Sequence, residues 1–124
     1  VPKYSFTTHT RTKETTREVS KPIIIVEGIL ILTDEDLRKE LDVSIFVDAD
    51  CDVRLARRLE RDIRERGRTT AQVLEQYFST VRPMHAQWVE PSKRYADLIV
   101  PTNDHSIDVA VQALCNFLRV KSGI

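Results

Sequence analysis

The chain has 124 residues, 41% of them hydrophobic and 31% charged, which is the composition of one compact globular domain or part of one. Its 19 basic and 19 acidic side chains cancel to zero net charge, so we expect no nucleic-acid partner. No uninterrupted apolar stretch reaches the roughly 20 residues that a membrane-spanning helix needs, so we also expect no membrane partner.

The chain begins with Val1, and its only methionine is Met84. We therefore expect that further residues precede it in the whole protein. Cys51 and Cys115 lie far apart and lack the spacing of a zinc site or a disulfide framework. Reduced thiols and a cytoplasmic location are the corresponding expectation.

The first 50 residues predict four strands, with a short helix between the third and the fourth. Two β-prone segments, 3–8 and 15–19, are separated by the polar residues 9–14 and predict a two-stranded ribbon over residues 1–21. Residues 23–26 are all β-branched, which is typical of a strand inside a parallel sheet. A short helix over 34–41 and a second interior strand over 43–47 follow, so we expect these two strands to pair in parallel.

The next segment predicts two helices. Asp50 or Asp52 can cap the first, whose apolar residues recur at helical spacing until Gly67 ends it. Thr69, followed three residues later by Gln72, forms a capping box that begins the second helix. Pro83 is expected to bend or end that helix.

The last part of the chain predicts a strand and a helix. Residues 98–100 are a third buried strand, stopped by Pro101, and a helix beginning near Asp104 or Ser106 follows. We expect this helix to bury Ile107, Ala110, Val111, Leu114, Phe117 and Leu118. Alternating strands and helices indicate an α/β fold, with polar residues gathered at the carboxyl ends of the strands as in a ligand site. The residues at those ends are Glu27, Asp48, Asp50 and the turn 102–104.

Arginine dominates the segment from Asp52 to Arg68, where seven arginines oppose four acidic residues and leave a net charge of +3. Planar guanidinium groups match phosphate oxygens, and at helical spacing several can share one face. The alternative is a solvated helix held by Arg-to-Glu pairs four residues apart. Gly67 between Arg66 and Arg68 favours a mobile lid.

Three further sets of candidate residues have both a functional and a structural interpretation. Glu27 follows four aliphatic residues, where either a magnesium ion or a basic side chain would keep its carboxylate ionised. Tyr4, Phe6 and His9 could stack on and hydrogen-bond a planar base, or simply pack on the domain. Gln76 is either a ligand or a solvated side chain.

Several catalytic motifs are missing from these 124 residues. There is no Gly-x-Ser-x-Gly or His-Glu-x-x-His pattern, so acyl transfer and zinc hydrolysis are not indicated. There is also no phosphate-cradling Gly-x-x-x-x-Gly-Lys-Ser/Thr loop, since the only glycines are Gly28, Gly67 and Gly123.

An ordered set of short motifs resembles the uridine/cytidine kinase family over nearly the whole chain. The matching segments are 1–6, 9–11, 26–30, 46–48, 52–55, 57–68, 76–77, 81–83, 90–93, 95–97 and 99–101. The resemblance implies the carboxy-terminal portion of a P-loop NTPase-type parallel sheet with flanking helices and a β-ribbon. It implies transfer of the γ-phosphate of ATP or GTP, with Mg²⁺, to the 5′-hydroxyl of uridine or cytidine, and a homo-oligomer (tetramer) in pyrimidine salvage.

The same resemblance implies one partial domain over 1–124 and a role for each candidate residue. Its parts are a nucleoside-binding ribbon (1–21), sheet strands (22–50), an arginine-rich lid with the following helix (51–84) and the last strand and helix (97–120). Tyr4, Phe6 and His9 would contact the pyrimidine. Arg58, Arg68 and Gln76 would close over the nucleoside, and Arg61 and Arg66 would face the phosphates. Glu27 would lie near magnesium and Asp104 near the nucleotide base, although Thr102-Asn103 replaces the family's usual Arg-Gly.

The resemblance places the P-loop half upstream of Val1, so we expect these 124 residues to be inactive alone. Two alternatives of other classes remain: a non-catalytic kinase-like domain with a regulatory or oligomer-assembly role, and an RNA-binding module that uses the arginine helix. A half-domain would also leave apolar area exposed, which predicts association.

Overall fold

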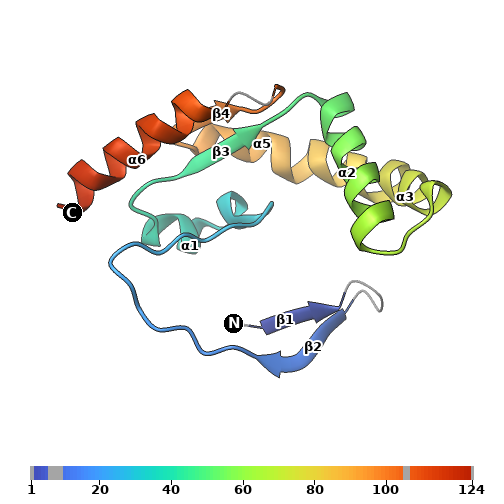
Figure 1. Cartoon of the computed structure of the whole chain (residues 1–124), viewed down its shortest axis with the longest axis horizontal. Helices are drawn as coiled ribbons and strands as arrows, with labels where there is room; N and C mark the ends of the chain where they lie inside the picture. Colours follow the sequence, from blue (N-terminus) through green and yellow to red (C-terminus); the bar gives the residue numbers. More distant parts are fainter. Residues whose placement is uncertain (1, 6–9, 105–106, 124) are drawn as a thin grey trace.

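The computed structural model describes residues 2–5, 10–104 and 107–123, and its strands and helices alternate as in an α/β fold (Figure 1). The short elements η1 and η4 are 3₁₀ turns, whereas η2 and η3 are π-helical. In chain order the elements are β1 (Pro2–Ser5), β2 (Thr10–Thr15), η1 (Ile31–Thr33), α1 (Glu35–Glu40), β3 (Ile45–Asp48), α2 (Cys51–Glu65), α3 (Thr70–Gln76), η2 (Tyr77–Val81), α4 (Arg82–Met84), η3 (His85–Val89), α5 (Glu90–Ser92), η4 (Lys93–Tyr95), β4 (Leu98–Pro101) and α6 (Asp108–Ser122).

The parallel sheet consists of β3 and β4, with Ile45 opposite Leu98 and Asp48 opposite Pro101. This confirms an α/β fold with a parallel pair, but the partner of β3 is not the predicted one. Residues 23–26 form no strand, and Ile25 is 83% exposed. β-branched residues form a strand only when a neighbouring strand completes its hydrogen bonds. In the described part of the chain β3 and β4 pair with each other in a sheet of two strands, so neither of them pairs with residues 23–26.

The amino-terminal sheet is separate and antiparallel (Figure 1). β1 pairs with β2, Ser5 lying opposite Thr10 and Tyr4 opposite Arg11. The second strand therefore covers 10–15 rather than the predicted 15–19. Register in a hairpin is set by where pairing begins, so a polar stretch such as 10–14 becomes strand when the connection before it is short.

The sequence-based expectation is that Pro83 bends or ends the helix that begins at Thr70, and the ending is wrong. The helical path continues from α3 to η4 and includes the segment around Trp88. The π-helical elements η2 and η3 lie just before Pro83 and Pro91. A π turn changes which carbonyl each N–H reaches, so the missing proline donor is accommodated without breaking the path.

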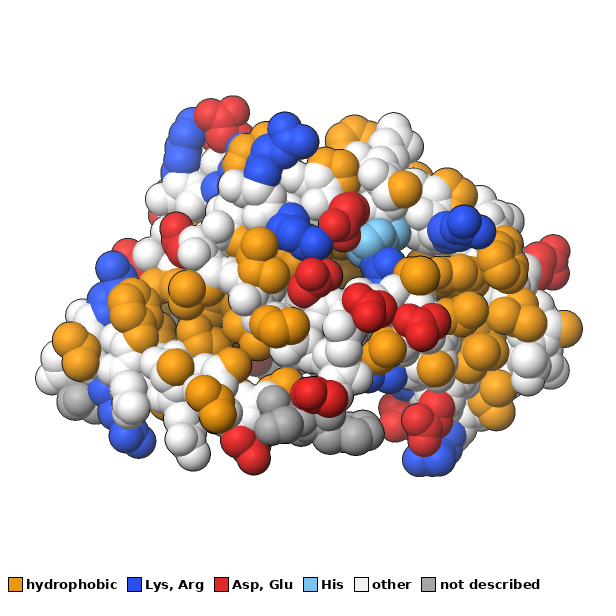
Figure 2. All heavy atoms as spheres, turned by 90° about the horizontal axis from the view of Figure 1, so that it is seen from above, with side chains coloured by type: hydrophobic (Ala, Val, Ile, Leu, Met, Phe, Trp, Pro, Cys, Tyr) orange, Lys and Arg blue, Asp and Glu red, His pale blue; other side chains and the backbone are white. Residues whose placement is uncertain are grey.

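Few apolar side chains are buried in the described residues: Leu32, Phe46 and Val73. Helix α6 begins at Asp108, later than predicted, and buries none of its side chains. Ile107, Val111 and Phe117 are exposed, whereas Ala110, Leu114 and Leu118 are half-buried. The predicted burial of this helix is therefore wrong here, because the described elements cover its apolar face only in part. Figure 2 shows hydrophobic side chains gathered over broad areas of the face seen from above. The exposed apolar area that the sequence predicted is therefore present.

Among the described helices, none combines the length and apolar character needed to cross a bilayer.

Candidate functional site

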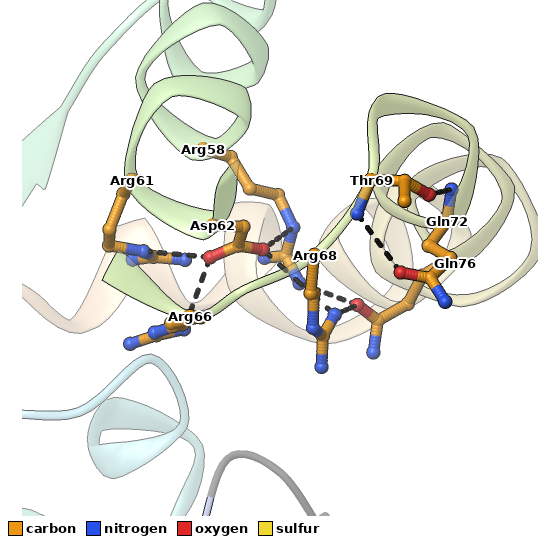
Figure 3. A network of polar contacts seen from close by, with 8 residues as sticks. All are labelled: Arg58, Arg61, Asp62, Arg66, Arg68, Thr69, Gln72 and Gln76. Atoms are coloured by element: carbon orange, nitrogen blue, oxygen red, sulfur yellow. Dashed lines mark hydrogen bonds and ion pairs between the residues drawn. The ribbon is translucent and has the colours of Figure 1, made fainter. Parts of the chain in front are cut away.

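Four arginines converge on one buried carboxylate, that of Asp62, which is 0% exposed (Figure 3). Asp62 Oδ1 accepts hydrogen bonds from Arg61 Nε at 3.0 Å and from Arg66 Nη1 at 3.3 Å. Asp62 Oδ2 lies 3.7 Å from Arg58 Nε and 3.9 Å from Arg68 Nη1. These five residues, here called the Asp62 cluster, carry four positive charges and one negative charge. Such a cluster is suited to holding a phosphate or another anion.

The backbone brings the arginines together at the end of α2. Arg58 and Arg66 are four residues before and after Asp62, so the helical repeat places all three on one face. Gly67 has φ of 63°, a left-handed conformation that glycine adopts without steric cost and that turns the chain back. Arg68 N–H then donates to the Asp62 carbonyl at 3.1 Å.

Gln76 joins the cluster from α3. Its Oε1 accepts from Arg58 Nη2 at 3.2 Å and from Arg68 Nη1 (Figure 3). The capping box that the sequence predicted fixes the start of this helix, since Thr69 Oγ1 accepts from Gln72 N–H at 3.2 Å and Thr69 N–H donates to Gln72 Oε1 at 3.0 Å. Gln76 is thus a bound side chain and not a solvated one.

The electrostatics of the cluster centre on Arg58. Partial burial lowers the pKa of Arg58 below its ordinary value, while Asp62 opposes that shift and the positive charges of Arg61, Arg68 and Arg66 add to it. Arginine remains protonated at neutral pH nevertheless. The negative charge of a bound anion would offset both the energetic cost of burying these positive charges and the repulsion between them.

The remaining arginines of α2 have other partners. Arg64 pairs with Glu60 at 2.8 Å, the exposed four-residue pair that the structural interpretation of this helix expected. Arg57 donates to Thr102, and Arg54 contacts His85. The arginines of this helix therefore divide into the Asp62 cluster and three with other partners, of which Arg54 is half-buried and Arg57 and Arg64 are exposed.

The carboxyl ends of β3 and β4 meet as predicted. Thr102 N–H and Oγ1 both donate to the Asp48 carbonyl, at 2.8 and 2.9 Å, and Asp50 N–H donates to Asn103 Oδ1 at 2.6 Å. Lys93 Nζ donates to the Asp48 carboxylate at 3.2 Å. Hydrogen bonds from Lys93 to Glu90 and Asp48 raise the pKa of that ammonium group, so it stays charged at neutral pH.

Glu27 and Asp104 are exposed and lie in irregular segments. The aliphatic residues before Glu27 are exposed too. The carboxylate of Glu27 is therefore not buried, and it does not need a partner to stay ionised. Described His, Cys, Asp and Glu side chains form no group of three that could hold a metal ion. A single carboxylate such as Glu27 fits Mg²⁺ only as one ligand beside phosphate and water, which is a usual arrangement for that ion.

The predicted base-stacking residues are not tested. Tyr4 lies in β1, whereas Phe6 and His9 fall outside the described residues. Their role in binding a pyrimidine stays a prediction.

Asp62 is the functional candidate that the sequence reasoning missed, because it was counted only as one of four acidic residues on the helix. A signal was present. Asp62 continues the helical stripe of Leu55 and Leu59, at a position where an apolar residue is expected, and arginines stand four residues to either side. A charged residue on the inner stripe of a helix needs paired partners.

Comparison with known proteins identifies the family. The model of the Phosphoribulokinase / Uridine kinase family matches residues 1–108. The chain is 50% identical to "Uridine kinase" of Anoxybacillus flavithermus and 52% identical to "Uridine kinase" of Geobacillus kaustophilus, each over 98% of this chain and 59% of the relative. It is 53% identical to "Uridine kinase" of Tolumonas auensis over 96% of this chain and 55% of the relative. The chain thus spans somewhat over half the length of these relatives, and it belongs to the Phosphoribulokinase / Uridine kinase family.

Proposed function

We propose that the whole protein is a uridine/cytidine kinase, which transfers the γ-phosphate of ATP or GTP to the 5′-hydroxyl of uridine or cytidine and yields UMP or CMP for pyrimidine salvage. Half of the residues are identical to those of proteins named uridine kinase. The structural observation that supports the proposal best is the convergence of four guanidinium groups on Asp62.

The Asp62 cluster suits phosphoryl transfer because that reaction spreads negative charge over the transferred group. Arg61 and Arg66, which share Asp62 Oδ1, would face the phosphates. Arg58 and Arg68, which both donate to Gln76, would close over the nucleoside. Positioned donors of this kind contribute roughly a hundredfold or more each to the rate.

The other binding roles follow from the family resemblance. Tyr4, Phe6 and His9 would hold the pyrimidine, and Asp104 would approach the base of the phosphate donor. Glu27 would supply one oxygen to Mg²⁺, whose charge would neutralise donor phosphates. We further propose a P-loop-type sheet, a cytoplasmic location and a homo-oligomer such as a tetramer. The free thiols of Cys51 and Cys115 and the exposed apolar side chains of α6 support the last two.

The direct test is a kinase assay of the whole protein with ATP, Mg²⁺ and either uridine or cytidine. We expect 5′-phosphorylation of one or both nucleosides. The 124 residues alone should give no turnover, because they contain no phosphate-cradling loop. A well-folded whole protein without turnover would contradict the proposal and favour the non-catalytic alternative.

A matched pair of variants connects the assay to the cluster. Arg68→Lys keeps the charge but loses the planar guanidinium group whose Nη1 contacts both Asp62 and Gln76, so we expect kcat/KM to fall about a hundredfold. Arg64→Lys makes the same chemical change at the exposed pair with Glu60 and should leave kcat/KM within about twofold. Equal effects of the two variants would contradict a special role of the cluster.

A further inference from the structure

The two carboxylate oxygens of Asp62 serve different arginines (Figure 3). Oδ1 accepts hydrogen bonds from Arg61 and Arg66, whereas Oδ2 lies beside Arg58 and Arg68. This division coincides with the two proposed roles, phosphate binding on the Oδ1 side and nucleoside closure on the Oδ2 side. One buried carboxylate therefore stands between the two halves of the proposed site.

The two sides also differ in how tightly they are held. Oδ1 has hydrogen bonds of 3.0 and 3.3 Å. Within the described part of the chain, Oδ2 and Arg58 Nε are both buried without a hydrogen-bond partner, and they face each other at 3.7 Å. A shift of less than about 1 Å would convert this contact into a charge-assisted hydrogen bond. The Oδ2 side is thus able to tighten when the Arg58 guanidinium moves.

The backbone adds a second link at the same residue. The Asp62 carbonyl accepts from Arg68 N–H at 3.1 Å, and Gly67 provides the left-handed turn that makes this bond possible. A displacement of Arg68 over a nucleoside would therefore be transmitted to Asp62 through both its side chain and its main chain.

We propose that Asp62 is a positioning residue that couples the phosphate-side arginines to the nucleoside-side arginines, so that the two sets are oriented as one unit. This inference rests on the proposed kinase function and deepens it. Asp62 does not touch either substrate. It acts through the guanidinium groups that it holds, and closure on one side favours the productive orientation on the other.

The test uses the whole protein and a double-mutant cycle across the carboxylate. Arg58→Gln and Arg61→Gln, singly and together, are measured for kcat/KM with uridine in the wild-type and Asp62→Asn backgrounds. In the wild-type background, we expect the double variant to lose at least about fivefold less than the product of the single losses, because removing either arginine already disturbs the unit. In the Asp62→Asn background, the losses should multiply to within about twofold.

Asp62→Asn itself gives a second readout that loss of folded protein would not reproduce. We expect the KM for the nucleoside to rise and kcat per folded molecule to fall, each about tenfold. Glu60→Gln, which removes a carboxylate from the exposed pair on the same helix, is the control and should change neither parameter beyond about twofold. An Asp62→Asn protein with a lower melting temperature but unchanged KM and kcat per folded molecule would overturn the inference.

If Asp62→Asn does not fold, the inference is tested with double-mutant cycles in the wild-type background alone. The Arg58 and Arg61 cycle is then compared with an Arg58 and Arg64 cycle, because Arg64 is on the same helix but pairs with Glu60 instead of Asp62. Greater coupling in the first cycle supports the inference, and equal coupling overturns it. Absence of uridine and cytidine phosphorylation by the wild-type protein would instead refute the proposed function, so the two failures are distinguishable.

Discussion

The α2–α3 region and α6 are both helical, yet they differ in how far their side chains are buried and bound by other residues. In α2–α3, Asp62 and Val73 are 0% exposed and Gln76 binds two arginines from the preceding segment. In α6, no side chain is buried, and the apolar Phe117 and Val111 remain open. The first region finds its partners within a short stretch of chain, whereas the second depends on partners distant in sequence or on another molecule.

This difference shows where stability and the candidate site coincide. A polar side chain whose partner lies four residues away on the same helix, or three residues away at a helix cap, meets that partner as soon as the local helix forms. An apolar helix face needs a second element of matching shape, and the described residues cover that face of α6 only in part. Substitutions in the two regions should therefore have different consequences.

Val73→Ala has the largest expected effect on stability. It removes two carbons from a fully buried position and leaves a cavity, so we expect the free energy of unfolding to fall by about 2 kcal/mol. Val120→Ala makes the same change in α6, where the side chain is 85% exposed, and should cost less than about 0.5 kcal/mol. Urea denaturation of the two variants checks the comparison. Equal costs would show that α6 is as well packed in solution as α3.

Thr69→Ala should have an intermediate effect. The variant loses the side-chain oxygen that accepts from Gln72 N–H and should be less stable by about 1 kcal/mol. Because α3 carries Gln76, we also expect weaker nucleoside binding, which isothermal titration calorimetry would measure. Thr70→Ala removes a neighbouring hydroxyl that makes no cap and serves as the control. Equal stability of the two variants would contradict the importance of the cap.

His85 predicts a small pH effect outside both regions. Burial lowers the pKa of His85 and the nearby charge of Arg54 lowers it further, while Glu90 acts in the opposite direction. The folded state thus disfavours the protonated ring. Its contribution to stability is complete above the ordinary pKa of 6.5 and declines as the pH falls below that value toward the lower folded pKa. Wild-type protein should lose stability below pH 6.5 more steeply than His85→Gln. Parallel stability curves from denaturation at several pH values would contradict this.

The local elements of the site could be read from residue patterns. The capping box at Thr69, the end of α2 near Gly67 and the meeting of Asp48 with residues 102–103 are all set by short-range rules or by strand polarity. The arginine richness of α2 also indicated an anion site, and Gln76 was among the candidates. Their contacts could not be assigned, because spacing along a helix does not say which guanidinium turns toward which oxygen.

What the sequence by itself determined is the α/β character, the family resemblance and most helix boundaries, since these depend on neighbouring residues. Only the tertiary structure decided that β3 pairs with β4, that residues 23–26 form no strand, that the helical path passes Pro83 and that Asp62 gathers four arginines. Each of these outcomes depends on which groups are available as partners in space. Local preference states what a segment can form, whereas hydrogen bonding and burial against other segments select what it does form.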